Sequence, residues 1–209
     1  MNLFIDSGRK VLSVALSNND ELLFVSNVNS YSKHSNYLMK EIINILKKAN
    51  ITLDDIDNII VLNGPGSFTG IRVGVTIAKT LAWVKNKKLY VLNNLEALKV
   101  GISDDVVISV IYDKDNNSYV GIYDNNIKED YMSLDDINIT NKNITLVSLE
   151  ESNYLLKLKD KLTVNNNVNV KIIDDYDYLN VINYAIKKGN INPHLAKPIY
   201  LKKIDAEKK

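Results

Sequence analysis

The stretch VLNGPGSFTGIRVGVTIAKTLA, residues 61–82, carries the most structural information in this 209-residue chain. Four of the eight glycines lie within it, at Gly64, Gly66, Gly70 and Gly74. An apolar strand followed by a glycine turn and a helix is the usual frame in which proteins bind anions at a helix N-terminus. The stretch therefore predicts a strand–turn–helix unit and raises the question of whether its loop binds phosphate.

The loop itself is built for a tight turn. Pro65 fixes φ and the glycines beside it permit positive φ, while either Ser67 or Thr69 can cap the helix that follows. The spacing fits neither nucleotide-binding signature, because Ile71 and Arg72 stand where a P-loop has its lysine and hydroxyl, and the third glycine comes one residue late for a dinucleotide loop. Binding of a phosphate to exposed N–H groups stays open. The candidate loop residues are Gly64, Pro65, Gly66, Ser67, Phe68, Thr69 and Arg72.

Small residues recur every four positions along the helix that follows the loop. Gly70, Gly74, Ala78 and Ala82 share one face, where they let another backbone approach closely. Two interpretations are open. The face packs on the protein's own sheet, or it meets a helix of a partner subunit.

A second helix is expected at residues 36–49, and its apolar stripe is wide. Deep burial in the chain's own core explains the width, and so does contact with another chain. The apolar residues of this helix are Leu38, Met39, Ile42, Ile43, Ile45, Leu46 and Ala49.

The pattern along the chain predicts an α/β fold of mixed sheets flanked by helices. In the first half, strands are expected at residues 2–6, 10–17, 22–28, 58–62 and 88–92. The sequence pattern is less clear in the second half of the chain. Strands are expected there at 106–112, 118–123, 144–149 and 168–173, and helices at 154–162 and 178–188. We expect an N-terminal lobe at 1–103 and a smaller C-terminal lobe at 104–209.

The composition excludes several classes of protein. The chain has no cysteine, so it has neither a disulfide framework nor a thiolate metal site. Its net charge of +1 argues against a protein that grips nucleic acid unaided. There is no basic segment leading into a long apolar run at the N-terminus, and no apolar run is long enough to cross a membrane. We expect a cytoplasmic protein.

Few side chains suggest chemistry. The two histidines, His34 and His194, are far apart in sequence, so we expect no metal site. Asp6 ends the first strand, where actin-like ATPases and sugar kinases place a carboxylate, and the alternative is a turn-stabilising residue. Asp113 has the same two interpretations in the second half.

Several motifs together resemble the bacterial TsaB (YeaZ) family, which serves in making threonylcarbamoyladenosine in tRNA. GPGSFTGIRVG at 64–74 resembles its signature, and FIDS at 4–7 resembles its opening hairpin. KHS at 33–35, LDDID at 53–57 and KPIYL at 197–201 resemble its later elements. The segment at 113–118 departs from the family pattern, since it keeps the aspartate but loses the arginine, glycine and glutamate.

The resemblance implies an actin-like (ASKHA, ribonuclease H-like) two-lobed fold and a non-catalytic scaffold subunit without cofactors. It implies pairing with the catalytic subunit TsaD, recruitment of the ATPase TsaE, contact with tRNA only through that complex, and a possible homodimer through the same surface. Catalytic relatives bind metal through His-x-x-x-His on the first helix, whereas His34 is followed four residues on by Leu38. Asp6 is then a vestige of a nucleotide site.

The expected partner interface lies on the two helices described above. We expect Leu38→Glu or Ala78→Glu to abolish association without unfolding the monomer, provided that these side chains face outward. An actin-like ATPase or sugar kinase, and a glycoprotease-like peptidase, stay open as alternative functions. The candidate interface residues are His34, Leu38, Met39, Ile42, Gly70, Gly74, Ala78 and Ala82.

Overall fold

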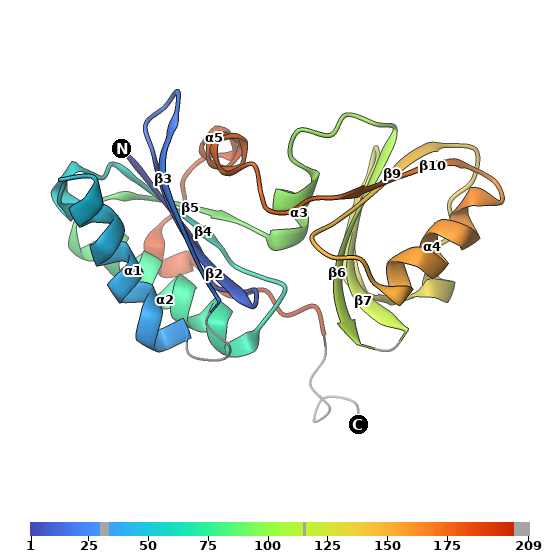
Figure 1. Ribbon diagram of the computed structural model, residues 1–209, viewed down its shortest axis with the longest axis horizontal. Helices are drawn as coiled ribbons and strands as arrows, with labels where there is room; N and C mark the ends of the chain where they lie inside the picture. The colour runs from blue at the N-terminus through green and yellow to red at the C-terminus, as the bar shows by residue number, and fades with distance from the viewer. Residues whose placement is uncertain (30–33, 115, 203–209) are drawn as a thin grey trace. The chain divides into compact units, whose positions relative to one another are not determined.

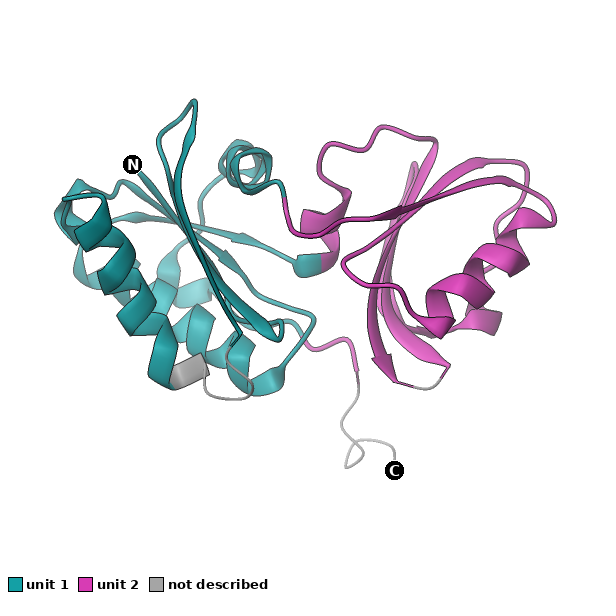
Figure 2. Ribbon diagram, in the orientation of Figure 1, with its two compact units in different colours: residues 1–94, 177–199 teal, residues 95–176, 200–209 magenta. Residues whose placement is uncertain are grey.

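The computed structural model describes residues 1–29, 34–114 and 116–202, without the side chains of residues 34 and 35. The chain forms two compact units (Figure 2), residues 1–94 with 177–199 and residues 95–176 with 200–209. These units differ from the lobes expected at 1–103 and 104–209. The chain leaves the first unit at Asn94, earlier than expected, and residues 177–199 return to it because the helix that they contain packs on the first sheet.

Unit 1 contains a five-stranded sheet in the order β3-β2-β1-β4-β5. Its first three strands are antiparallel neighbours joined by short turns, and β4 and β5 run parallel to β1. The strands are β1 (Asn2–Asp6), β2 (Val11–Ser17), β3 (Leu22–Asn29), β4 (Asn58–Leu62) and β5 (Lys88–Leu92). All five strands expected in the first half of the chain are therefore present.

Helices cover both faces of this sheet. α1 and α2 lie side by side on one face and α5 lies on the other (Figure 1). Because successive side chains of a strand point to opposite faces, Leu3 and Ile5 pack in the core beneath α1 and α2, whereas Phe4 meets Tyr178 of α5 with their ring centroids 5.4 Å apart. The helical segments of unit 1 are α1 (His34–Lys48), η1 (Leu53–Asp55), α2 (Phe68–Val84), α5 (Tyr178–Lys188) and η3 (Pro193–Leu195). α3 (Asn94–Lys99) follows β5, and all of it except Asn94 belongs to unit 2.

Unit 2 repeats this topology. Its sheet has the order β10-β9-β6-β7-β8, so an antiparallel meander is again followed by two parallel strands. α4 packs on the sheet through Tyr154, Leu155, Leu158 and Leu162. The elements are β6 (Val106–Lys114), β7 (Asn117–Tyr123), β8 (Ile127–Ser133), η2 (Leu134–Asp136), β9 (Asn143–Ser148), α4 (Asn153–Thr163) and β10 (Asn167–Ile172).

β8 is the strand that the sequence analysis missed. It reads IKEDYMS, with three consecutive charged residues in place of an apolar alternation. Pairing along its whole length with β7 holds it in the sheet, and this pairing partner is not visible from local composition. In the described part of the chain, no helix is long and apolar enough to span a membrane.

Candidate functional site

The glycine loop connects β4 to α2 as its sequence predicts. Gly64 has φ of +112°, a value that favours glycine, and the Gly64–Pro65 peptide is cis. Ser67 is the N-cap of α2, and its Oγ accepts a hydrogen bond of 3.3 Å from the N–H of Gly70. Of the two candidate caps, Ser67 therefore caps the helix, while Thr69 is exposed in the first turn.

The N–H groups of the loop are used inside the protein. The N–H of Ser67 donates to the carbonyl of Gly8 at 2.8 Å, which ties the loop to the β1–β2 turn. The N–H of Gly64 donates to Oδ1 of Asn94 at 2.9 Å, and the N–H of Asn94 donates back to the carbonyl of Gly64 at 2.8 Å. A β-carbon on Gly66 would collide with the carbonyl oxygen of Gly8. The loop is therefore closed against the first hairpin.

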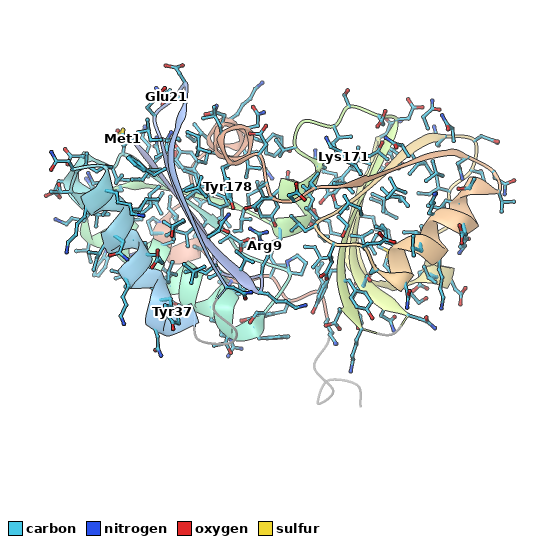
Figure 3. All side chains as sticks on the ribbon, in the orientation of Figure 1. Met1, Arg9, Glu21, Tyr37, Lys171 and Tyr178 are labelled. Atoms are coloured by element: carbon cyan, nitrogen blue, oxygen red, sulfur yellow. The ribbon has the colours of Figure 1, made fainter. Side chains whose placement is uncertain are left out.

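Asp6 lies at the end of β1, where the sequence places it, and is fully buried. Its carboxylate accepts hydrogen bonds from the N–H of Gly8 at 2.9 Å and from Nδ2 of Asn94 at 3.3 Å. It also forms an ion pair with Nε of Arg9 at 2.7 Å. Arg9, labelled in Figure 3, reaches back over the turn and donates through Nη2 to Oγ of Ser13 at 2.9 Å. Groups of the protein itself thus neutralise and hydrogen-bond this carboxylate.

The small-residue face of α2 packs on the chain's own sheet. Gly70, Gly74, Ala78 and Ala82 are all buried. The hydroxyl of Ser7 donates to the carbonyl of Gly70 at 2.8 Å, and a β-carbon on Gly74 would overlap that hydroxyl oxygen. Of the two open interpretations, internal packing is the one that these contacts support. The expectation that these four residues meet a partner is corrected, because Ser7 contacts the face at Gly70 and Gly74 and the chain's own core buries Ala78 and Ala82.

The apolar stripe of α1 divides into a buried and an exposed part. Leu38 and Ile42 are 0% and 2% exposed, so they belong to the core and do not meet a partner either. Met39 is 37% exposed, with Tyr37 at 37% and Ile43 at 44% beside it. Since Leu38 and Ala78 face inward, a glutamate at either position would bury a charge and unfold the protein. His34 is the first residue of α1, and its side chain lies outside the described residues.

Two asparagines and the C-terminal segment complete the site. Nδ2 of Asn63 donates to the carbonyl of Lys197 at 2.9 Å, and the N–H of Ile199 donates to the carbonyl of Asn63 at 2.8 Å. The KPIYL motif therefore lies on the glycine loop. The sequence analysis missed Asn63 and Asn94. The sequence signal for both is their position at the carboxyl end of a buried strand. Asn63 directly follows β4, and Asn94 is the second residue after β5.

Asp113 in β6 forms an ion pair with Lys202, and its Oδ2 also accepts a hydrogen bond of 2.8 Å from the hydroxyl of Tyr131. Burial pulls the pKa of Asp113 up, but the hydrogen bonds from Lys202 and Tyr131 outweigh it and leave that pKa below its usual range. The hydrogen bond to Asp113 raises the pKa of Lys202 to about 12. Asp113 thus anchors the C-terminal segment to the sheet of unit 2.

His194 is exposed, and its ring packs edge-on against Trp83 with centroids 5.7 Å apart. Among the residues whose side chains are described, no three His, Asp or Glu side chains gather in a cluster that could hold a metal ion.

The family model for TsaD, the tRNA N6-adenosine threonylcarbamoyltransferase, matches residues 28–137. The tRNA threonylcarbamoyladenosine biosynthesis protein TsaB of Bacillus subtilis is 34% identical over 123 residues, which cover 58% of this chain and 54% of that protein. The tRNA N6-adenosine threonylcarbamoyltransferase of Brachyspira hyodysenteriae is 38% identical over 97 residues, 44% of this chain and 28% of that protein. The matched region thus spans about half the length of the first relative and less of the second.

The fold extends the likeness to nearly the whole chain. The structure of YeaZ from Pseudomonas aeruginosa superposes with a TM-score of 0.74, covering 96% of this chain and 99% of that one at 18% identity. A second structure from that organism, described as similar to peptidase YeaZ, gives a TM-score of 0.77 with the same coverage. The predicted α/β fold of two lobes, each a mixed sheet with flanking helices, and the resemblance to TsaB (YeaZ) are confirmed.

Proposed function

Since the chain belongs to the TsaD family of tRNA N6-adenosine threonylcarbamoyltransferases and their relatives, with TsaB among the most similar, we propose that it acts in the biosynthesis of threonylcarbamoyladenosine in tRNA. Within that pathway its role is that of a non-catalytic subunit that pairs with a TsaD-like catalytic protein. The observation that carries the proposal is the 34% identity with TsaB over 58% of the chain, together with a YeaZ fold over 96% of the chain.

The internal bonding of the glycine loop supports the non-catalytic role. An actin-like nucleotide site needs N–H groups and a carboxylate that are free to meet phosphate and its metal ion. Here Arg9 neutralises Asp6, and Gly8 and Asn94 take up the N–H groups of Ser67 and Gly64. Opening this site for a nucleotide would break an ion pair and several hydrogen bonds, at a cost of about 1–3 kcal/mol for each buried group left unpaired.

The partner surface that we propose is the solvent-facing side of α1 beside α2. Met39 and Ile43 are four residues apart, so they share one side of α1, and both are large apolar side chains more than a third exposed. Apolar side chains, methionine among them, are typical of the buried core of a protein–protein interface. A TsaD-like protein is the primary occupant, a second copy of this chain competes for the same face, and a TsaE-like ATPase joins the assembled pair.

Reconstitution tests the function directly. The TsaD-like protein from the same genome is assayed for threonylcarbamoyladenosine formation on tRNA, alone and with this chain, and then with the TsaE-like protein. We expect the chain to have no activity alone, to co-purify with the TsaD-like protein and to raise its product formation. A chain that modifies tRNA or hydrolyses ATP by itself, with turnover lost in Asp6→Asn, would contradict the non-catalytic role.

A point variant tests the surface. Ile43→Glu places a charge on the exposed side of α1 and is expected to weaken binding of the TsaD-like protein by about tenfold or more, measured by titration calorimetry. The matched control is Val164→Glu, since Val164 is 77% exposed and lies in unit 2. Equal binding by both variants, with unchanged circular dichroism, would place the interface elsewhere.

A further inference from the structure

Asn63 and Gly64 form the only Asn-Gly dipeptide in the chain. Asparagine is chemically labile, most of all before glycine, which has no β-carbon to obstruct attack by its backbone nitrogen on the asparagine carboxamide. The attack forms a bond between the glycine nitrogen and Cγ, and Nδ2 leaves as ammonia. Water then opens the succinimide ring to aspartate or isoaspartate. The local sequence therefore favours deamidation at Asn63 more than at any other asparagine of the chain.

The backbone nitrogen that would attack is held away from this reaction. The N–H of Gly64 donates to Oδ1 of Asn94 at 2.9 Å, and the N–H of Asn63 donates to the carbonyl of Leu92 at 3.0 Å. To reach Cγ of Asn63, the nitrogen of Gly64 must lose its proton and turn towards the side chain. The hydrogen bond to Asn94 opposes both changes, so the fold restrains the nucleophile.

Residues 197–199 restrain the carboxamide that would be attacked. Nδ2 of Asn63 donates to the carbonyl of Lys197 at 2.9 Å, and the carbonyl of Asn63 accepts a hydrogen bond of 2.8 Å from the N–H of Ile199. A β-carbon on Gly64 would lie 2.7 Å from the carbonyl oxygen of Ile199, so this segment lies directly against the dipeptide. Only 6% of Asn63 is exposed. Both rotation of the carboxamide and access of water therefore require that residues 197–199 leave the loop.

We propose that Asn63 is a deamidation site controlled by residues 197–199, unreactive while this segment lies on the glycine loop and reactive once it leaves. The segment belongs to no helix or strand, Lys197 is exposed, and Pro198 has no N–H to donate. Such segments open locally at a lower free energy than the whole domain unfolds. All of these residues lie in unit 1, and the site does not depend on the proposed function.

Deamidation would also prevent the segment from returning. It replaces Nδ2, the donor to the carbonyl of Lys197, by an oxygen that cannot donate when the new carboxyl group is ionised. Oδ1 of Asn63 is buried and has no hydrogen-bond partner in the described part of the chain. A carboxylate here would face a carbonyl without a compensating donor, and burying a charge in that way is unfavourable. The reaction therefore makes release of residues 197–199 permanent.

Two truncated chains test the control of the reaction. One ends at Ala196, which keeps this residue of the core, and the other ends at Lys202. Each is incubated beside the full chain at mildly alkaline pH, and peptide mass spectrometry follows deamidation of Asn63. We expect the chain that ends at Ala196 to deamidate about tenfold or more faster than the full chain, because the protecting contacts are absent. The chain that ends at Lys202 is the control and should match the full chain.

Equal rates in the two truncated chains would overturn the proposal. A full chain that deamidates as fast in buffer as in concentrated urea would overturn it too, because the folded state would then give Asn63 no protection.

Asn63→Asp in the full chain tests the consequence, since it has the side chain of one product. Hydrogen exchange should become about tenfold or more faster in residues 197–199 and stay unchanged in β4. Asn190→Asp, an exposed asparagine of the same unit, is the matched control and should leave both regions unchanged. Slow exchange of residues 197–199 in Asn63→Asp, or loss of protection throughout β4 as well, would contradict a release confined to this segment.

Discussion

Two carboxylates occupy equivalent strands and have similar partners. Asp6 ends β1 and Asp113 lies near the end of β6, the first strand of each meander. Each forms an ion pair with a basic residue, Arg9 in one unit and Lys202 in the other. In both units the carboxylate at this position is therefore held in an internal ion pair.

The ion pair between Lys202 and Asp113 predicts a pH-dependent stability. Because the pKa of Asp113 is lowered in the folded protein, its ionised form stabilises the fold above the ordinary carboxyl pKa, and this contribution is lost as pH falls through the folded value. The pKa of Lys202 is raised to about 12, so its contribution is present at neutral pH and is lost only as pH rises toward that value.

We therefore expect Lys202→Met to lower the free energy of unfolding by about 1 kcal/mol at neutral pH and by less near pH 3, below the ordinary carboxyl pKa. Urea unfolding of both proteins across this range measures the difference. Lys171→Met, in the exposed part of β10, is the control and should have little effect at either pH. If Lys202→Met lowers the free energy of unfolding equally at neutral pH and near pH 3, the charges of the ion pair do not contribute to stability.

At the scale of elements, the contact between α2 and the first hairpin decides how the glycine motif is used. The small residues bring α2 close enough for Ser7 to donate to the carbonyl of Gly70. The same closeness lets the loop bond to Gly8. Once the motif is packed in this way, it serves to position a helix.

Gly74→Ala tests this packing, because the new β-carbon would overlap Oγ of Ser7. We expect a loss of about 1–3 kcal/mol in the free energy of unfolding, the usual cost of overpacking. Adding Ser7→Ala removes the overlapping oxygen and should recover part of that loss. Thr76→Ala, on the exposed side of the same helix, is the control. If the losses of unfolding free energy in Gly74→Ala and Ser7→Ala simply add in the double variant, the two side chains do not compete for space.

At the scale of the whole molecule, unit 1 is discontinuous in sequence. Its sheet is complete by residue 92, yet α5 covers one face and returns from beyond unit 2. The buried side chains that α5 brings are Tyr178, Val181, Ile182 and Ala185. The N-terminal half of the chain therefore does not contain a complete core.

Truncation after Tyr176 is expected to unfold unit 1. Each large buried side chain of α5 contributes about 1.5–3 kcal/mol, so their combined loss is comparable with the total stability of a domain, about 5–15 kcal/mol. Limited proteolysis should then cleave within residues 1–94 first, while the sheet of unit 2, all within residues 106–172, is cleaved later. Truncation after Lys202 keeps all described residues and is the control. Equal protease resistance of the two truncated chains would refute the dependence on α5.

Local sequence signals were sufficient for most elements and for the family. Short apolar segments bounded by turn residues predicted the strands of the first meander, and the glycine turn with its serine cap predicted the start of α2. β8 was the exception, since its charged residues lie on an edge strand and give no apolar pattern. Long-range features of the site, such as the contact of Asn63 with Lys197, had no local signal.

The sequence by itself thus determined which residues share a face, and the tertiary structure decided what each face meets. A period of four fixes that Gly70, Gly74, Ala78 and Ala82 align, but it does not distinguish a partner helix from the chain's own hairpin. Likewise, the pattern of residues 178–188 predicts a helix but not the sheet that it covers. The physical reason is that helix and strand periodicity arises from neighbouring residues, whereas burial depends on contacts between segments distant in sequence.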